Sequence, residues 1–340
     1  MNPFVKLIRL AAIYRAYRRR QEAPAALPLR LWIETASCCN LRCIMCPNKD
    51  VAASAKGVMK MDLFRKIIDE AREFALDVNL HHRGEPLMNP ALFDMVRYAK
   101  AAGLNVRFHT NGGLLDEDKA GRLLDAGPDL VSFSFDGFTR ETYERVRQGG
   151  RFEQTRDRIL GFAALRRRRG LKKPYIVVEK IRFRNQADAG DPAAVQALRR
   201  RFLEAGVDEI IEKEEYVWAE PAPPVPSAKR RYAVCTFPWY AMVICADGTV
   251  TPCPQDFHAA MALGNAREAS LREIWTGPAY RRLRRQFVED VEALPLCRAC
   301  DRLNRKTVAG VPLQYMATFL TDQLLSYGRL RKWLGTQERN

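Results

Sequence analysis

The chain has 340 residues, 47% of them hydrophobic, and a net charge of +16, which is enough apolar sequence for one large domain and a smaller one. No run approaches the roughly 20 apolar residues that span a bilayer, and residues 1–20 have no signal-peptide cleavage site. We therefore expect a cytoplasmic protein, whose nine cysteines serve as metal ligands or catalytic thiols rather than disulfides.

Residues 1–28 form a basic N-terminal extension that we expect to be helical. Its first 20 residues hold six lysines and arginines and no acid. One face of this helix would carry Phe4, Leu7, Ile8, Ala11 and Tyr14. That pattern permits docking on the protein's own body, which we favour, or peripheral membrane contact. Other basic runs indicate solvated helix faces, and no aromatic-interleaved motif accompanies them, so we expect no nucleic-acid partner.

Between residues 29 and 218, β-rich runs alternate with segments of helical periodicity. The expected strands are Arg30–Thr35, Val78–His82, Asn105–His109, Leu130–Phe135, Tyr175–Ile181 and Glu209–Glu212. Such alternation predicts an α/β domain of parallel strands joined by right-handed helical crossovers. Six such units favour a partial (β/α)6 barrel over a closed eight-fold one.

Composition and hydrophobic periodicity predict the remaining domain boundaries. The proline-rich segment AEPAPPVPS predicts a linker at 219–234. A small cysteine-rich domain is expected at 235–310. The periodicity after it predicts a C-terminal helix and tail at 311–340.

Three cysteines, Cys39, Cys43 and Cys46, directly follow the first expected strand. They therefore lie at the carboxyl end of a strand, where α/β barrels place their active sites. An iron–sulfur cluster usually has four protein ligands. Three thiolates would bind three irons of a cubane cluster and leave the fourth iron without a protein ligand. At this point a zinc site or a set of buried structural thiols remains an alternative.

This C-x3-C-x2-C spacing resembles the signature of the radical S-adenosylmethionine (radical SAM) superfamily. Arg83-Gly84-Glu85-Pro86 resembles the family's G-G-E-P motif, with Arg83 in place of the first glycine. Thr110-Asn111-Gly112 and Ser134-Phe135-Asp136-Gly137 resemble two further motifs at strand ends. Cys38 would give the wrong spacing, so we expect it to be a small buried residue.

The resemblance implies cofactors and a reaction. Cys39, Cys43 and Cys46 would hold a 4Fe–4S cluster that reductively cleaves S-adenosylmethionine (SAM) to a 5′-deoxyadenosyl radical, which abstracts a hydrogen atom from a substrate carbon. A reducing flavodoxin or ferredoxin system would supply the electron. The residues implied to bind SAM are Gly84, Glu85, Pro86, Asn111, Ser134 and Arg147.

The C-terminal cysteines Cys235, Cys253, Cys297 and Cys300 lie in sequence that resembles the SPASM extension of radical SAM enzymes. The resemblance implies one auxiliary 4Fe–4S cluster with four ligands. The first two cysteines flank an expected hairpin, whose Asp-Gly pair signals a type I′ turn. A structural zinc ribbon held by the same four cysteines is the alternative.

Two further residues are candidates for catalysis. Glu179 lies at a strand end and is expected to accept a proton. Cys245 is expected to donate a hydrogen atom or to be a small buried strand residue. Other strand-end side chains are expected to face the substrate or to pair with one another; they are His81, His82, Arg83, Lys180, Lys213 and Glu214.

The expected substrate is a small polar molecule, such as a sugar or an aminocyclitol, that is oxidised or epimerised; we favour oxidation. Residues 1–28 are too short for the leader-binding domain that many peptide modifiers carry, which makes modification of a ribosomal peptide the second hypothesis. The third comes from another class of protein, a non-catalytic iron–sulfur or zinc-binding scaffold for electron transfer.

Overall fold

The computed structural model describes residues 3–183, 191–215, 235–298, 300, 303, 307–308 and 311–312. The linker expected at 219–234 lies outside the described residues. The C-terminal helix and tail expected at 311–340 also lie outside them, except for residues 311–312.

The chain divides into two compact units, and each is assembled from separate stretches. Unit 1 contains residues 3–33, 62–78 and the described residues from 235 onward. Unit 2 contains residues 34–61 and the described part of 79–215. The boundaries expected from the sequence are contiguous instead, because composition does not show which distant stretches pack together.

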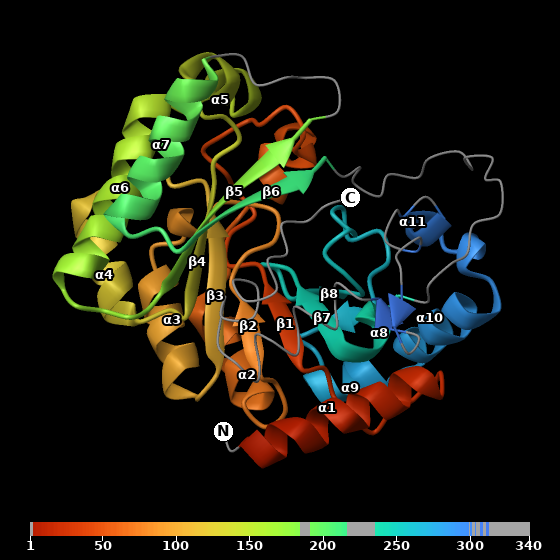
Figure 1. The fold of residues 1–340 in the computed structure, drawn as a ribbon. Helices are drawn as coiled ribbons and strands as arrows, with labels where there is room; N and C mark the ends of the chain where they lie inside the picture. Colours follow the sequence, from red (N-terminus) through yellow and green to blue (C-terminus); the bar gives the residue numbers. More distant parts are fainter. Residues whose placement is uncertain are drawn as a thin grey trace. The chain divides into compact units, whose positions relative to one another are not determined.

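The sheet of unit 2 is parallel. Its strands, hydrogen-bonded in chain order, are β3 (Asn105–Thr110), β4 (Leu130–Ser134), β5 (Tyr175–Arg182) and β6 (Glu209–Glu214). The helices of this unit are α3 (Leu92–Ala101), α4 (Glu117–Ala126), α5 (Arg140–Val146), α6 (Phe152–Arg168) and α7 (Pro192–Ala205), with short 3-10 helices at η1 (Pro47–Asp50), η2 (Ala53–Ala55) and η3 (Pro86–Met88). Helices α3, α4, α6 and α7 pack in that order along one side of the strands (Figure 1).

The two faces of this sheet differ in chemistry, because side chains alternate along a strand. One face carries fully buried aromatic residues, among them Phe108 and Phe133, and Phe133 packs edge-on against Phe162 of α6. The other face carries His109, Glu179 and Lys213 near the carboxyl ends of β3, β5 and β6. The polar residues are therefore gathered on the face that the helices do not cover.

Local signals set the ends of the connecting helices. The Asp116 side chain accepts a hydrogen bond from Lys119 N at 2.8 Å and caps the start of α4, and Gly127 ends this helix with a φ of 70°. Asp191 caps α7 in the same way, with Pro192 at the first helical position. Caps of this kind fix where each crossover leaves and rejoins the sheet.

Unit 1 holds a smaller sheet. β1 (Arg30–Ile33) lies parallel to β7 (Ala241–Ile244), followed by the antiparallel strands β8 (Thr249–Thr251) and β9 (Gly264–Asn265). The helices are α1 (Pro3–Arg18), α2 (Met61–Ala71), α8 (Phe237–Tyr240), α9 (Leu271–Thr276), α10 (Pro278–Glu289), α11 (Pro295–Arg298) and the 3-10 helix η4 (Val291–Ala293). β2 (Asp77–Asn79) leads from unit 1 into unit 2, and β10 (Thr307–Val308) pairs with β11 (Val311–Pro312).

Arg284 of α10 ties the helices of unit 1 together. Its side chain is fully buried and donates to the carbonyls of Pro238, Glu22 and Trp275 at 2.8–2.9 Å. Burial lowers the pKa of Arg284 to about 10, so the guanidinium stays charged at neutral pH. Because charged donors make the stronger hydrogen bonds, this residue fixes α8 and α9 relative to α10.

The hairpin predicted between Cys235 and Cys253 is present, but its turn differs from the predicted type. Gly248 N donates to Cys245 O at 2.9 Å, and within the turn only Gly248 has a positive φ, of 96°. A type I′ turn needs positive φ at both central residues. This geometry is instead a type I turn followed by a glycine bulge, which an Asp-Gly pair fits equally well.

Helix α1 docks on unit 1 with its C-terminal half. Ile13, Ala16 and Tyr17 are buried, and Ile13 joins a core cluster that includes Phe237. The expectation that α1 docks through the face of Phe4, Leu7, Ile8, Ala11 and Tyr14 is wrong: these residues are exposed, and the helix docks through its opposite side. In the described parts of the chain, no helix is both long and apolar enough to cross a membrane.

Candidate active site

The loop with the first three cysteines belongs to unit 2 and is held by the end of α5. Ile44 N donates to Val146 O at 3.0 Å, and Arg42 N donates to Gln148 O at 2.9 Å. Cys43 is buried, and Cys39 and Cys46 are half-buried. The backbone of the loop is thus fixed on both sides of Cys43.

The three thiols influence one another electrostatically. The pKa of Cys39 is raised to about 12, mainly by burial and in smaller part by the neighbouring Glu85, Cys43 and Cys46. Three thiolates in one buried place repel one another unless cations lie among them. The donor set therefore fits an iron–sulfur cluster. Within the described residues, no group of three or more His, Cys, Asp or Glu side chains is placed so that it could hold a single metal ion.

One protein cation lies beside this loop. Arg147 Nη1 is 3.8 Å from Cys43 Sγ, and its guanidinium also binds the Asp136 carboxylate, with Nε at 2.8 Å. Burial opposes the charge, but Asp136 and Cys43 outweigh it and raise the pKa of Arg147. Arg147 is therefore a permanent cation within reach of the thiol group.

Gly84 lies directly against the backbone just before Cys39. A Cβ atom at residue 84 would lie 2.4 Å from the carbonyl oxygens of both Ala36 and Cys38. Glu85 N donates to Cys38 O at 2.8 Å across this contact. Cys38 is half-buried rather than buried as expected, and it takes part in this contact through its backbone.

The Glu85 carboxylate is buried and joins two strand ends. Its Oε1 accepts from Thr110 Oγ1 at 2.7 Å and Leu87 N at 3.1 Å, and its Oε2 accepts from Asn111 N at 2.7 Å. A carboxylate has about four acceptor positions. Three of these are used within the chain, so one position on Oε2 is left for a further donor. Pro86, the next residue, is buried and starts η3.

The Asn111 side chain connects this carboxylate to the cysteine loop. Its Nδ2 donates to Asn40 Oδ1 at 2.9 Å and lies 3.9 Å from Cys39 Sγ. Its Oδ1 accepts from Gly113 N at 2.8 Å. The predicted site residues Cys39, Glu85 and Asn111 are thus brought together by direct contacts.

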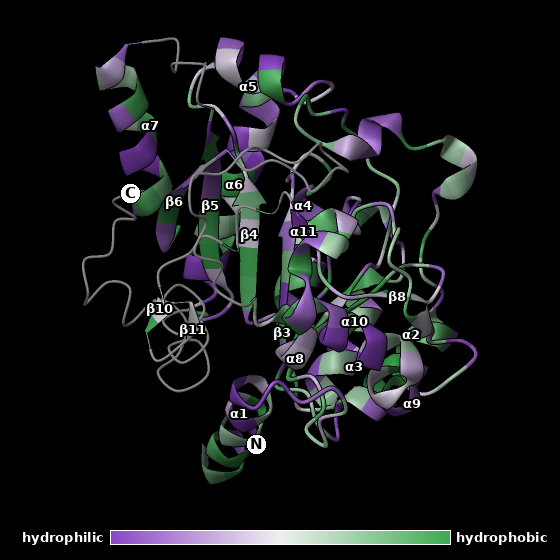
Figure 2. Ribbon diagram, turned by 90° about the vertical axis from the view of Figure 1, so that its right-hand side faces the viewer, coloured by the Kyte–Doolittle hydropathy of each residue, from purple (hydrophilic) through white to green (hydrophobic). Residues whose placement is uncertain are grey.

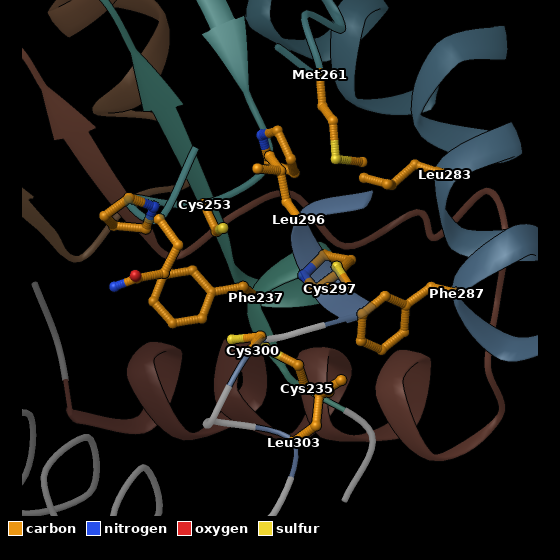
Figure 3. A pocket seen from close by; sticks show the side chains of 14 residues that line it. Cys235, Phe237, Cys253, Met261, Leu283, Phe287, Leu296, Cys297, Cys300 and Leu303 are labelled. Atoms are coloured by element: carbon orange, nitrogen blue, oxygen red, sulfur yellow. The ribbon is translucent and has the colours of Figure 1, made fainter. Parts of the chain in front are cut away.

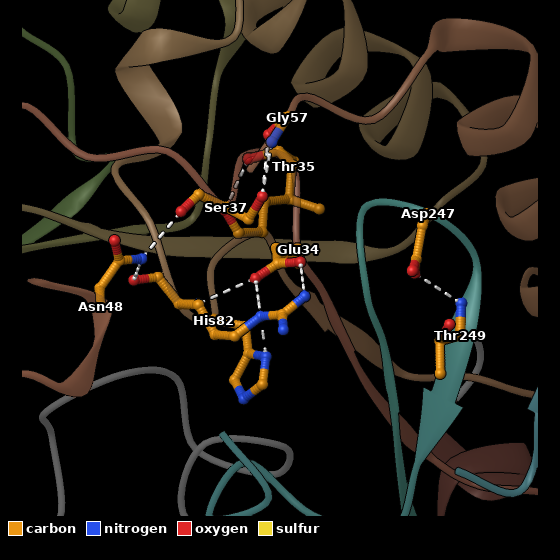
Figure 4. Close-up of polar contacts among 10 residues, drawn as sticks. Glu34, Thr35, Ser37, Asn48, Gly57, His82, Asp247 and Thr249 are labelled. Carbon is orange, nitrogen blue, oxygen red and sulfur yellow. Dashed lines mark hydrogen bonds and ion pairs between the residues drawn. The ribbon is translucent and has the colours of Figure 1, made fainter. Parts of the chain in front are cut away.

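Arg83, two residues before Glu85, forms an ion pair that the sequence analysis did not predict. Glu34 is fully buried and accepts from Arg83 Nε at 2.6 Å and Nη2 at 2.7 Å (Figure 4). Asn48 Nδ2 donates to the carbonyls of Ser37 and Arg83 at 2.8 and 2.9 Å. Arg83, which stands where the family motif has glycine, is therefore held in an ion pair with Glu34.

A second polar group occupies the uncovered face of the sheet. The rings of His81 and His109 stack at 4.1 Å between centroids. His109 Nδ1 lies 3.6 Å from Glu179 Oε2, and Lys213 Nζ donates to the same oxygen at 2.8 Å. The structure thus brings together three of the predicted strand-end residues, His81, Glu179 and Lys213, with His109, which the sequence analysis did not single out. Ser134 is on the same face of β4, paired in register with Glu179.

Burial and charge set the protonation of this group. Burial lowers the pKa of His109 to about 4 and that of His81 well below its usual value, so both rings are neutral at neutral pH. Burial would raise the pKa of Glu179, but Lys213 and His109 outweigh it and lower that pKa to about 2. Lys180 lies on the opposite face, with its ammonium 5.6 Å from the ring of Phe138.

The four C-terminal cysteines line one cavity of unit 1 (Figure 3). Apart from the sulfurs its wall is mainly apolar and includes Phe237, Met261 and Phe287. Burial raises the pKa of Cys253 to about 12, with Cys235 and Cys300 adding to it, and raises the pKa of Cys297 as well. Four thiols in an apolar cavity fit a cluster with all its iron positions occupied by protein.

Cys245 lies outside this cavity lining. It follows β7, is 1% exposed, and its N–H donates to Thr249 O at 2.8 Å. The burial agrees with the reading of Cys245 as a small strand residue.

Comparison with known proteins identifies both cysteine regions. Residues 33–173 match the family model of the radical SAM superfamily, and residues 235–301 match the SPASM model, an iron–sulfur cluster-binding domain. The chain contains a radical SAM domain followed by a SPASM domain. The cofactors are therefore SAM, a 4Fe–4S cluster and an auxiliary iron–sulfur cluster, and the SPASM match decides against the zinc ribbon.

A related curated protein spans most of the chain. It is a tungsten-containing aldehyde ferredoxin oxidoreductase cofactor-modifying protein of Pyrococcus furiosus, 28% identical over 80% of this chain and 86% of its own length.

Two solved structures share the fold. BtrN in complex with AdoMet and 2-DOIA is 19% identical, covers 81% of this chain and 93% of its own, and has a TM-score of 0.53. Streptococcus suis SuiB bound to precursor peptide SuiA is 15% identical, covers 84% and 72%, and has a TM-score of 0.56. The predicted α/β partial barrel of the radical SAM type is thereby confirmed.

Replacing Gly84 should disrupt the cysteine loop. We expect Gly84→Ala to lose about half of the bound iron, because the added methyl group separates the Glu85 segment from the loop while the SPASM cysteines are untouched. Iron and sulfide analysis of anaerobically reconstituted protein measures this. Gly57→Ala is the matched control, since no atom lies within 4 Å of its added Cβ. Full iron content in Gly84→Ala would show that the close approach is dispensable.

The two cysteine groups should load iron independently. We expect about eight irons per chain in the reconstituted protein and about four in the variant Cys39→Ala/Cys43→Ala/Cys46→Ala, because each cubane cluster contains four irons. A folded triple variant without iron would contradict the assignment of the auxiliary cluster.

Proposed function

We propose that this radical SAM enzyme oxidises a hydroxyl-bearing carbon of a small polar molecule, such as a sugar or an aminocyclitol. The observation that carries the proposal is the group formed by His81, His109, Glu179 and Lys213 at the carboxyl ends of the strands of unit 2. These side chains offer hydrogen-bond donors and acceptors next to each other. Such an arrangement suits neighbouring hydroxyl or amino groups better than an apolar side chain of a peptide.

We propose that Cys39, Cys43 and Cys46 hold the 4Fe–4S cluster. When bound, SAM and the reduced cluster supply a 5′-deoxyadenosyl radical that takes a hydrogen atom from an unactivated carbon. The remaining acceptor position of Glu85 supports its role as a partner for the SAM amino group.

Other chain residues would orient the rest of SAM. Asn111 is fixed by Asn40 and lies beside the cysteine loop, and Arg147 is a buried cation that suits a carboxylate. Ser134 is half-buried at the end of β4 and stays a candidate for the same role. Gly84 and Pro86 shape the backbone that presents Glu85.

Oxidation of an alcohol carbon removes one hydrogen atom, one proton and one electron. The 5′-deoxyadenosyl radical would take the hydrogen atom, and the auxiliary cluster would accept the electron. Glu179 was expected to accept the proton, but its low pKa and its ion pair with Lys213 make it a weak base. We therefore assign the proton to His109, whose neutral ring is the more basic of the two. Glu179 would orient His109 through the Nδ1 side, which leaves Nε2 to accept the proton.

We propose that Cys235, Cys253, Cys297 and Cys300 hold the auxiliary cluster. Four thiolates occupy all four iron positions of a cubane cluster, which favours electron transfer over ligand binding. The cavity around these half-buried cysteines is lined mainly by apolar side chains. A flavodoxin or ferredoxin of a reducing cytoplasmic compartment is the proposed electron donor.

Removing the proposed base should uncouple the reaction. With a panel of sugars and aminocyclitols, we expect His109→Asn to keep forming 5′-deoxyadenosine while oxidised product falls by about 100-fold, the usual contribution of a general base. Mass spectrometry of both products gives the ratio. Glu179→Gln should show a smaller loss, and His258→Asn, an exposed histidine, none. An unchanged product ratio in His109→Asn would remove His109 from this role.

Cys245 distinguishes oxidation from epimerisation. Because Cys245 is buried, we expect Cys245→Ala to retain turnover and to give the same product, two mass units lighter than the substrate. An epimerase would need a thiol to return a hydrogen atom. Solvent deuterium in the wild-type product that disappears in the variant would therefore refute oxidation. Stimulation of SAM cleavage only by a peptide would refute the small-molecule proposal as a whole.

A further inference from the structure

The solvent-facing side of α1 is apolar over its first turns. Phe4, Leu7 and Ile8 are 68%, 49% and 52% exposed. They follow the i, i+3, i+4 spacing of one helix face, and exposed Ala11 continues this face at i+7. The hydrophobic bands of α1 are visible in Figure 2. Contiguous exposed apolar residues of this kind mark a surface that binds another apolar surface.

The docked half of α1 prevents this face from turning inward. Ile13, Ala16 and Tyr17 hold the opposite side of the helix in the core of unit 1. At the end of the helix the Arg20 guanidinium stacks on the Tyr17 ring at 4.3 Å, and Trp239 Nε1 donates to Gln21 O at 2.9 Å. Rotating α1 to bury Phe4, Leu7 and Ile8 would therefore expose residues that are now buried.

The charge along the same segment is of one sign. Arg15, Arg18 and Arg19 are exposed in the last turn of α1 and just beyond it, and the first 20 residues contain no acid. The exposed surface thus combines an apolar stripe at one end with cations at the other. An anionic surface is complementary to these positive charges, whereas a second copy of α1 would carry charges of the same sign.

We propose that α1 binds the surface of an anionic lipid membrane. Phe4, Leu7 and Ile8 enter the boundary between headgroups and acyl chains, and Arg15, Arg18 and Arg19 contact the anionic headgroups. The helix lies on the membrane and does not span it. The proposal is independent of the proposed reaction, since it uses no residue of the cysteine loop, of the cavity or of the histidine group.

Vesicle co-sedimentation of the full-length, cluster-loaded protein tests this. With vesicles of phosphatidylglycerol and phosphatidylcholine we expect the wild type to pellet, and with phosphatidylcholine alone to stay in the supernatant. Raising the salt concentration should weaken the binding, because the headgroup contacts are screened. Leu7→Ser/Ile8→Ser should lower the affinity for the anionic vesicles by about 100-fold, since two apolar side chains no longer enter the membrane.

Matched variants separate this surface from general effects. Leu171→Ser/Leu203→Ser also removes two exposed leucines, which are 40% and 50% exposed, and should bind as the wild type. Arg15→Gln/Arg18→Gln/Arg19→Gln should lose binding, whereas Arg272→Gln/Arg281→Gln/Arg282→Gln, with three exposed arginines elsewhere, should keep it. Circular dichroism and iron content confirm that each variant is folded.

Three results would overturn the proposal. The first is equal binding of the wild type to both kinds of vesicle, or to neither. The second is unchanged binding of Leu7→Ser/Ile8→Ser to the anionic vesicles. The third is a dimer in sedimentation velocity that dissociates in this variant, since the apolar stripe would then bind a second copy.

Discussion

The close approach of Gly84 to the backbone of residues 36–38 is the contact on which the cysteine site depends. No side chain fits there, because its Cβ would overlap two carbonyl oxygens. The approach allows Glu85 N to bond to Cys38 O, and the Glu85 carboxylate then accepts from Thr110 and Asn111 at the end of β3. One glycine thus links the loop that carries the thiols to a neighbouring strand end. Arg83 can replace the preceding glycine of the family motif because its side chain is held by Glu34.

The polar residues on the uncovered face of the unit 2 sheet lower the stability of the fold, and a role in binding a polar molecule would explain their presence. Burying an ion pair seldom stabilises a fold relative to apolar residues of similar size, and neutral buried histidines lose hydrogen bonds to water. Glu179 and Lys213 offset part of this cost by pairing. His81 and His109 offset it by stacking and by remaining neutral. Polar residues gathered where an apolar core would be more stable are expected at a site that binds a polar molecule.

The sequence predicted the elements more reliably than the interactions between them. β3 to β6 begin at the predicted residues, because buried β-branched and aromatic runs between turn signals are local features. The candidate ligands Cys39, Cys43 and Cys46 were assigned from their spacing, which is also local. The Glu34–Arg83 pair was missed because its partners are 49 residues apart. The weak basicity of Glu179 was missed because it comes from Lys213 on the next strand, and the turn at Gly248 was mistaken because Asp-Gly fits two turn types.

Metal binding and folding are coupled at both thiol groups. Burial raises the pKa of Cys39 and of Cys253 to about 12, so these thiols are protonated at neutral pH when no iron is bound. Iron binding must displace these protons, and the free energy of binding then contributes to folding. In unit 1 the cysteines come from separate segments, with Cys235 before α8, Cys253 after β8, and Cys297 and Cys300 in and after α11. A cluster bound to all four would therefore cross-link these short segments, which are too small to bury much apolar surface by themselves. The thiols that are proposed to hold the auxiliary cluster would in this way also stabilise the domain that contains them.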